Sequence, residues 1–198
     1  MQLLRTRTSR ITAAVLLATL ILGWLWYDRF IEEGNFSVII PNTLYRSGTL
    51  SQHEWKEIRR DNPPFRSVIN LRGLKKQQEW FKREAALSQQ SGISFYTYPL
   101  SAKQSPSLVT MEALVELMRA APKPLLVHCK SGSDRTGLAL ALYAYAIEGK
   151  PAQVAAKQLS IKWGHFPWLA SRTNAMDNAF LAYIQAHPQN PVPITPTR

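Results

Sequence analysis

The chain alternates short apolar runs with longer amphipathic stretches, and this alternation predicts strands and helices in turn. Runs that are apolar, or that alternate with polar residues, predict strands at 36–40, 43–46, 65–71, 93–98 and 125–127. Beyond a short helix after Ser51, apolar side chains at helical spacing predict helices at 75–90, 108–121, 136–147, 151–161 and 172–186. This order predicts an α/β layered domain with a central, mostly parallel sheet flanked by helices.

The N-terminal part of the chain has a different pattern. Three arginines in the first ten residues precede an uncharged run at 11–27, which is close to the shortest length that can span a bilayer. The run ends in Trp24, Trp26 and Tyr27, which resemble an interfacial aromatic belt more than the small-residue cleavage site of a signal peptide. It also lacks the polar face of a soluble helix, so an uncleaved single-pass anchor is the favoured prediction.

These patterns divide the chain into a basic segment at 1–10, a transmembrane anchor at 11–27, a tether at 28–35, a folded domain at 36–187 and a Pro-rich tail at 188–198. The positive-inside rule keeps the arginines in the cytoplasm. The domain is therefore predicted on the extracytoplasmic side of the cell membrane, which is the periplasm if the cell is Gram-negative.

Composition narrows the function only partly. The 198 residues carry a formal net charge of +11, which favours anionic partners such as phosphorylated protein, phosphoinositide, nucleic acid or acidic lipid without choosing among them. The single cysteine excludes an internal disulfide framework. No internal repeat and no metal-ligand spacing is visible, so neither a metal nor a cofactor is predicted.

The stretch VHCKSGSDRTG at 127–137 carries the chemistry. It places Cys129 between a buried strand and a helix, where the first N–H groups of the helix have no partner and favour an anion. The small residues Ser131, Gly132 and Ser133 allow successive N–H groups to surround one oxyanion, and Arg135 adds a planar fork of donors. The same positive surroundings should lower the pKa of Cys129, which indicates attack of sulfur on phosphorus and a phosphocysteine intermediate.

With Cys and Arg separated by five residues, this stretch resembles the active-site loop of the cysteine-dependent phosphatases, and it is most similar to the compact dual-specificity group with its bacterial tyrosine phosphatases. The resemblance implies a dual-specificity phosphatase-like fold, with Cys129 as the nucleophile and Arg135 as the phosphate clamp. It also implies that the substrate is bound by the loop residues Lys130, Ser131, Gly132, Ser133, Thr136 and Gly137, the Thr136 hydroxyl steadying the thiolate. The expected partner is a phosphorylated protein or another phosphomonoester, and no nucleic acid is expected.

The cysteine has two other interpretations. An isolated cysteine is usually a small buried hydrophobe, but here Arg135, the glycines and the strand-to-helix position all agree on an anion site. Rhodanese-like sulfurtransferases also carry a cysteine on such a loop, usually with one residue fewer before the arginine. The spacing therefore favours the phosphatase.

A general acid is the part that the sequence lacks. The resembling family places an Asp on the loop before the helix that precedes the cysteine, and the corresponding segment 99–106 contains neither Asp nor Glu. Three accounts stay open: Asp134 in the phosphate loop is the acid, an aryl leaving group departs without one, or the protein is a weak enzyme or an idle phospho-ligand binding module. A phosphoinositide phosphatase is a further alternative. Asp134 could equally have only a structural role.

Two further residues are candidates for the site, but another role is favoured for each. Arg46 is expected in a surface or structural ion pair, in preference to adding positive potential to the site. His165 lies in the aromatic segment 162–168 and is expected to be a packed loop histidine in preference to a substrate contact or proton carrier.

Overall fold

The computed structural model describes residues 2–28, 34–168 and 171–189. Most of the predicted tether and nearly all of the predicted Pro-rich tail, at 29–33 and 190–198, lie outside the described residues.

The domain is built on a five-stranded sheet in the order β1-β2-β5-β3-β4. The strands are β1 Ser37–Ile40, β2 Leu44–Ser47, β3 Ser67–Asn70, β4 Ser94–Thr97 and β5 Leu125–His128. Only β1 and β2 pair antiparallel, as the tight turn between them requires, and the β2·β5, β5·β3 and β3·β4 pairs are parallel. The predicted mostly parallel α/β sheet is confirmed.

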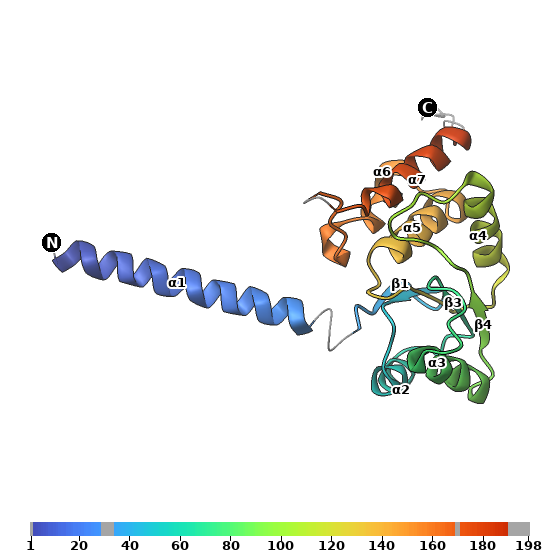
Figure 1. The fold of residues 1–198 in the computed structure, drawn as a ribbon, viewed down its shortest axis with the longest axis horizontal. Coiled ribbons are helices and arrows are strands. Elements are labelled where there is room, and N and C mark those ends of the chain that lie inside the picture. Colours follow the sequence, from blue (N-terminus) through green and yellow to red (C-terminus); the bar gives the residue numbers. More distant parts are fainter. Residues whose placement is uncertain (1, 29–33, 169–170, 190–198) are drawn as a thin grey trace, which may run out of the picture.

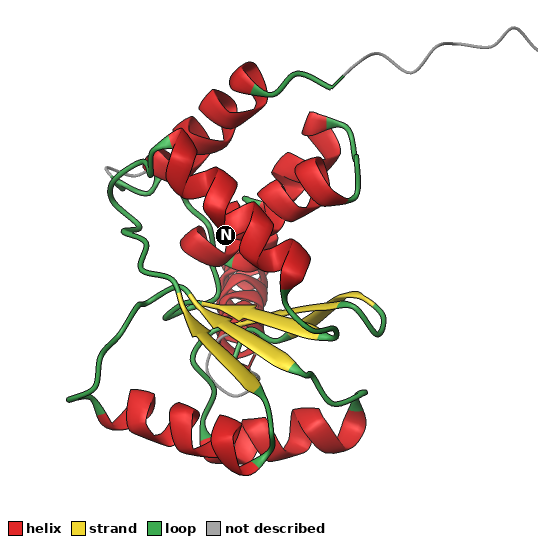
Figure 2. Cartoon of the chain, turned by 90° about the vertical axis from the view of Figure 1, so that its right-hand side faces the viewer, coloured by secondary structure: helices red, strands yellow, loops and turns green. Residues whose placement is uncertain are grey.

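Helices cover both faces of this sheet. They are α2 Gln52–Asp61, α3 Glu79–Gln90, α4 Leu108–Ala120, α5 Asp134–Leu142, the short α6 Ala152–Ala155 and α7 Asn174–Ala186. Figures 1 and 2 show α2 and α3 on one face, and α4, α5, α6 and α7 on the other. Successive side chains of a strand point to opposite faces of the sheet, so one strand contacts both layers of helices. In β5, Leu126 packs toward α2, while Leu125 and Val127 pack toward α4 and α5.

Some predicted helix bounds were wrong. The helix expected from 75 begins at Glu79, and the one expected from 136 begins two residues earlier and ends in a π-helical turn, Tyr143–Ile147. The stretch 151–161 is not one helix, since α6 passes into the 3-10 turns Ala156–Gln158 and Ile161–Trp163. This interruption brings the Gln158 side chain against the buried Arg46, where its Oε1 accepts a hydrogen bond of 2.9 Å.

The N-terminal helix α1, Gln2–Tyr27, is the only helix in the described part of the chain that is long and apolar enough to cross a membrane. The criterion is met by the segment Ser9–Tyr27, with a mean hydropathy of 1.6. Its side chains are exposed along the segment, so the domain does not cover its apolar surface. The helix is thus compatible with a membrane anchor by length and composition.

Candidate active site

The backbone of the loop after β5 is held by its carbonyl groups. Five successive carbonyls each accept a hydrogen bond from a donor on the outer side of the loop, away from the hollow that the loop encloses. The pairs are Thr49 Oγ1 to Cys129 O (3.0 Å), Thr49 N to Lys130 O (3.1 Å), Asn35 Nδ2 to Ser131 O (2.8 Å), Arg46 Nη2 to Gly132 O (2.6 Å) and Gly137 N to Ser133 O (2.7 Å). A trans peptide points its N–H opposite to its carbonyl. The N–H groups of residues 130–134 therefore turn away from these donors, into the hollow where an oxyanion would bind.

Gly132 allows the loop to pack directly on β2. Its φ is +72°, and a Cβ there would lie 2.7 Å from both the carbonyl carbon and oxygen of Ser47. Any side chain would be strained in this backbone conformation and would also collide with a strand that cannot move. The glycine of the sequence motif is thus required by close backbone contact.

Arg46 was expected in a surface or a structural ion pair, and because it is fully buried the surface alternative is wrong. Besides its bond to Gly132 O, it donates to Gln158 Oε1, and its guanidinium lies 4.1 Å from the centre of the Trp163 ring. A buried guanidinium is stable where its donors are satisfied and an aromatic face covers it. Arg46 is therefore a structural cation that fixes the shape of the phosphate loop from the side of its carbonyl groups.

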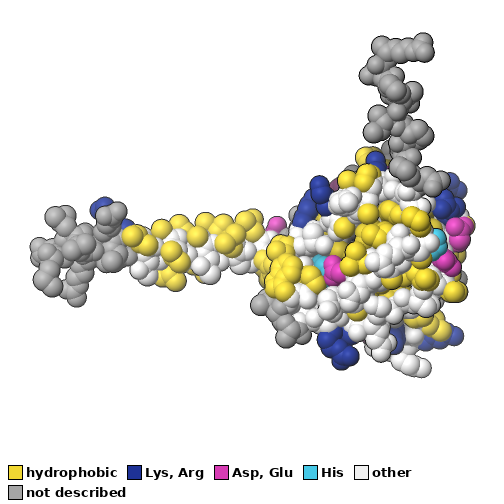
Figure 3. Space-filling model, turned by 90° about the horizontal axis from the view of Figure 1, so that it is seen from above, with side chains coloured by type: hydrophobic (Ala, Val, Ile, Leu, Met, Phe, Trp, Pro, Cys, Tyr) yellow, Lys and Arg dark blue, Asp and Glu magenta, His cyan; other side chains and the backbone are white. Residues whose placement is uncertain are grey.

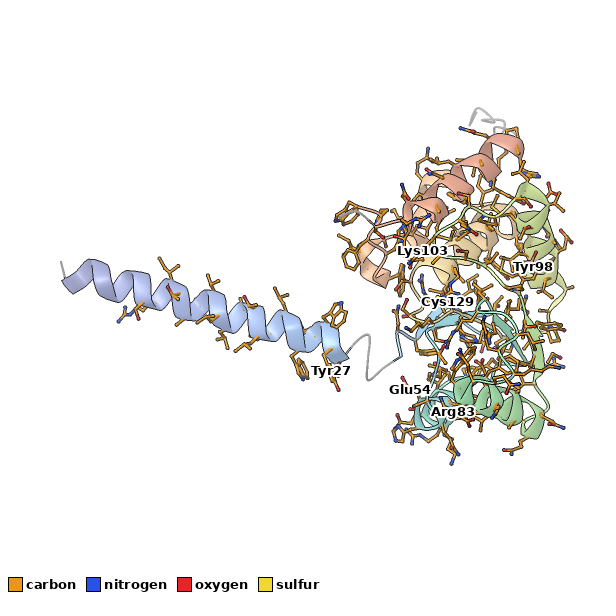
Figure 4. All side chains as sticks on the ribbon, in the orientation of Figure 1. Tyr27, Glu54, Arg83, Tyr98, Lys103 and Cys129 are labelled. Atoms are coloured by element: carbon orange, nitrogen blue, oxygen red, sulfur yellow. The ribbon has the colours of Figure 1, made fainter. Side chains whose placement is uncertain are left out.

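Cys129 is 1% exposed and lies where this loop leaves the sheet (Figure 4). Burial alone raises the pKa of its thiol. The charge of Arg135, the Thr136 hydroxyl and the N–H groups of Thr136 and Gly132 together lower the pKa by more, so it lies below its ordinary value. The thiolate is accordingly the favoured form at a lower pH than for a free cysteine.

Arg135 reaches from the first turn of α5 toward the same hollow. Its Nη1 donates to Leu100 O (3.3 Å) and Leu71 O (3.4 Å), which aligns the guanidinium between two loops. The buried Arg135 Nε has no hydrogen-bond partner, and the buried Thr136 hydroxyl finds no nitrogen or oxygen partner. An unpartnered guanidinium donor beside a thiolate is suited to bind an oxygen of an anionic ligand.

A second arginine, Arg72, lies close to the site and was not identified from the sequence. Its Nη1 donates to Thr49 Oγ1 (2.8 Å), and its guanidinium stacks on the Trp80 ring at 3.4 Å. Burial and the charge of Arg135 lower its pKa, while Glu84 and Cys129 raise it. The sequence signal was its position directly after β3, at the same sheet edge as Cys129.

His128, the residue before the cysteine, contacts the buried carboxylate of Glu84. His128 Nε2 lies 2.8 Å from Glu84 Oε1, and Asn70 Nδ2 donates to Glu84 Oε2 (3.1 Å). Burial lowers the pKa of His128, but Glu84 and the carbonyl of Cys129 raise it more, so the net direction is upward. The sequence pattern missed Glu84, which occupies a core-facing position of α3 because these partners satisfy it.

Asp134, the candidate acid, is bonded to His165. This histidine is fully buried, as the sequence favoured, with Nδ1 2.7 Å from Asp134 Oδ1 and Nε2 2.9 Å from Asp177 Oδ2. Burial lowers its pKa, but the hydrogen bonds and charges of the two carboxylates raise it to about 9. The cation ties the aromatic segment 162–168 to the phosphate loop, so Asp134 has a structural contact whatever else it does.

This histidine should make stability depend on pH. A pKa of about 9 in the fold, against 6.5 when unfolded, contributes stability fully below pH 6.5 that is lost as the pH rises through 9. The free energy of unfolding should fall across this window by about 3 kcal/mol from this group. Denaturant unfolding at a series of pH values measures the loss, which should be absent in His165→Gln. An equal loss in that variant would show that another group causes it.

The segment 99–106, where the resembling family places its acid, closes the site from the side of β4. Leu100 O accepts from Arg135, and Figure 4 marks the exposed Lys103 on this segment. It holds no carboxylate. In the phosphate loop itself the carboxylate is that of Asp134, whose side chain is 20% exposed.

Comparisons with known proteins agree with this geometry. A family model described as "Polymorphic toxin system, DSP-PTPase phosphatase" matches residues 42–148, more than half of the chain. Among solved structures, TpbA of P. aeruginosa in complex with pTyr is similar with a TM-score of 0.57 and 22% identity, covering 76% of this chain and 90% of that one.

Two eukaryotic structures share the fold. The core catalytic domain of the PP-IP phosphatase SIW14 from S. cerevisiae gives a TM-score of 0.56 at 17% identity, over 72% of this chain and 83% of that one. Human DUSP28 gives a TM-score of 0.54 at 16% identity, over 76% of this chain and 93% of that one. No curated protein matches the sequence.

Proposed function

The chain belongs to the DSP-PTPase phosphatase family and is a phosphomonoester hydrolase of the tyrosine and dual-specificity type, and we propose that it works through a phosphocysteine on Cys129. The observation that carries this proposal is the convergence in one hollow of a low-pKa thiol, inward N–H groups and the unpartnered Nε of Arg135.

The geometry supports a two-step reaction. The Cys129 thiolate attacks phosphorus, so a P–S bond forms as the P–O bond to the leaving group breaks. The N–H groups of 130–135 and the Arg135 guanidinium stabilise the three equatorial oxygens, which carry the negative charge of the transferring group in the transition state. Water then attacks the same phosphorus and loses a proton to the Asp134 carboxylate as the P–S bond breaks, which releases inorganic phosphate and returns the thiolate, steadied by the Thr136 hydroxyl.

We assign the proton for the leaving oxygen to the carboxylic acid form of Asp134, which stands in the loop beside Arg135 and is partly exposed toward solvent. This form arises when the carboxylate that pairs with His165 takes up a proton from solvent. Asp134→Asn should lower kcat for alkyl phosphates by about 10²-fold or more, and for aryl phosphates much less, since a phenolate leaves without help. Steady-state kinetics on one aryl and one alkyl phosphate measures the difference. Equal losses on both substrates, or no loss on either, would remove Asp134 as the acid.

His165→Gln is the matched control for that experiment. It removes the imidazolium contact to Asp134 Oδ1 but leaves the carboxyl group. If Asp134 were only a structural partner of His165, both variants should show the same modest loss on both substrates. A loss confined to alkyl substrates in Asp134→Asn alone supports the acid.

The second candidate function is a catalytically idle module that binds a phosphorylated ligand, and the segment 99–106 without a carboxylate favours it. Vanadate-sensitive turnover by the full chain decides between the two. Tight binding of phosphate without turnover would support the module. The substrates proposed for the enzyme are phosphotyrosine and, with Asp134 as acid, phosphoserine and phosphothreonine; the TpbA complex with pTyr supports the first.

We further propose that α1 anchors the enzyme in the cell membrane with the catalytic domain on the extracytoplasmic side. The length and hydropathy of Ser9–Tyr27 and the arginines before it support this topology. Protease added to intact spheroplasts should cut the domain and spare the N-terminal segment. Protection of the domain until the cells are lysed would contradict the orientation.

A further inference from the structure

The tether joins the domain at the rim of the active site. Gly34 O accepts a hydrogen bond of 2.7 Å from Gly48 N, beside the phosphate loop. The next residue, Asn35, is fully buried and donates to Ser131 O in that loop. A small cavity of about 230 Å³ is lined by Gly34 together with Lys130 and Arg83. Among the described residues that line it, the carboxylate is that of Glu54, which accepts from the backbone N–H of Ser51.

Chain length limits how far this rim can lie from α1. Six peptide units connect Asp28, next to the end of α1, with Gly34. A fully extended chain covers at most about 3.6 Å per residue, so these two residues are at most about 22 Å apart. If α1 spans the bilayer, the mouth of the active site stays within that reach of the lipid headgroups.

The segment 161–168, here called the rim loop, lies between the tether and the phosphate loop. Asn35 Nδ2 donates to Trp163 O (3.2 Å), and His165 contacts Asp134. The rim loop exposes large apolar side chains, with Ile161 56%, Phe166 38% and Trp168 49% exposed, while Lys162 beside them is exposed as well. Figure 3 shows hydrophobic side chains gathered at the end of the domain that faces α1.

These side chains are of the kind found at a membrane interface. Phe166 and Trp168 contact edge to face at 5.9 Å, which gives a compact aromatic surface. Aromatic rings prefer the headgroup level of a bilayer, and lysines such as Lys162 and Lys130 are attracted to anionic lipid. The tether places this surface within reach of the same bilayer.

We propose that the rim loop docks on the bilayer in which α1 is anchored, and that the enzyme, in addition to phosphotyrosine, hydrolyses a phosphomonoester carried by the headgroup of a membrane lipid. This inference rests on the proposed phosphatase and anchor. The tether keeps the active site close to the level of the lipid headgroups. A globular phosphoprotein, by contrast, would have to enter between the rim loop and the membrane to reach the site.

The activity test uses the full chain reconstituted into anionic phospholipid vesicles that contain a phosphoinositide monophosphate. Trp168→Ser should lower phosphate release from this lipid by about tenfold, because less of the site is held at the interface, and should change turnover of soluble p-nitrophenyl phosphate less than twofold. The matched control is Val109→Ser, an exposed apolar residue on α4, which lies on the side of the domain away from α1 (Figure 1). Equal lipid turnover in both variants would overturn the proposal.

A second measurement does not depend on activity. Benzoylphenylalanine in place of Trp168 should cross-link to phospholipid on irradiation of the reconstituted chain, and in place of Val109 it should not. No lipid adduct at 168 would overturn the docking. Hydrolysis of a membrane-anchored phosphotyrosine peptide but not of the lipid would overturn the lipid substrate. Absence of turnover on p-nitrophenyl phosphate would instead refute the phosphatase mechanism, and the cross-link would still report on the docking.

Discussion

Replacing Cys129 by Ser should abolish turnover, lowering kcat by about 10⁴-fold or more. The thiol owes its low pKa to Arg135, Thr136 and the loop N–H groups. A serine hydroxyl starts from a far higher pKa, so the same surroundings leave it protonated and a poor nucleophile. The carbonyl contacts that hold the loop do not involve the sulfur, so the variant should still bind inorganic phosphate. Kinetics on an aryl phosphate and calorimetry with phosphate measure the two properties separately.

The matched control is Cys129→Ala, which removes the hydroxyl as well. If the thiolate is the nucleophile, the Ser and Ala variants should be equally inactive with an unchanged thermal midpoint. Turnover of the Ser variant within tenfold of the natural chain would mean that the attacking group is elsewhere.

Arg135→Lys should lower kcat/KM by about 10²- to 10³-fold although the charge is kept. Lysine has no planar fork, so it cannot hold its position through Leu71 O and Leu100 O while donating to two phosphoryl oxygens. The positive charge still lowers the pKa of Cys129, so the rate of thiol alkylation by iodoacetamide at neutral pH should change only a few-fold. The two measurements together separate the geometry of the guanidinium from its charge.

For this prediction Arg66→Lys serves as the control, because Arg66 is exposed at the start of β3 and lines a cavity away from the phosphate loop. It should retain full activity. If Arg135→Lys were equally active, the phosphate clamp would have to be assigned to another donor, with Arg72 the first candidate.

The sheet could be predicted from the sequence because burial on two faces leaves a clear pattern. Every residue of strands β3 and β5 is buried, and their apolar side chains alternate between the two helical layers. The stretch 151–161 could not be predicted as turns, because its interruption depends on long-range contacts. Gln158 Oε1 bonds to Arg46, and its carbonyl oxygen lies where a Cβ on Gly137 would come within 2.8 Å.

The centre of the site could be predicted and its supports could not. Cys129 and Arg135 lie in one local motif whose spacing carries the geometry. Asn35, Arg46 and Thr49, which hold the loop's carbonyls, are 80 to 96 residues away in sequence from the carbonyls they bind, and the local sequence does not indicate these contacts. For the same reason the contacts of His165 with Asp134 and Asp177 could not be predicted from the sequence.

The most direct test of the central claim is mass spectrometry of the full chain denatured rapidly at alkaline pH during turnover of an aryl phosphate, because the P–S bond hydrolyses readily in acid. The structure predicts that the peptide containing Cys129 gains the mass of one phosphoryl group, that the modification maps to the sulfur, and that it is absent in Cys129→Ser. A chain that turns over substrate without any such adduct under rapid quenching, or one whose phosphoryl group maps to another residue, would contradict it.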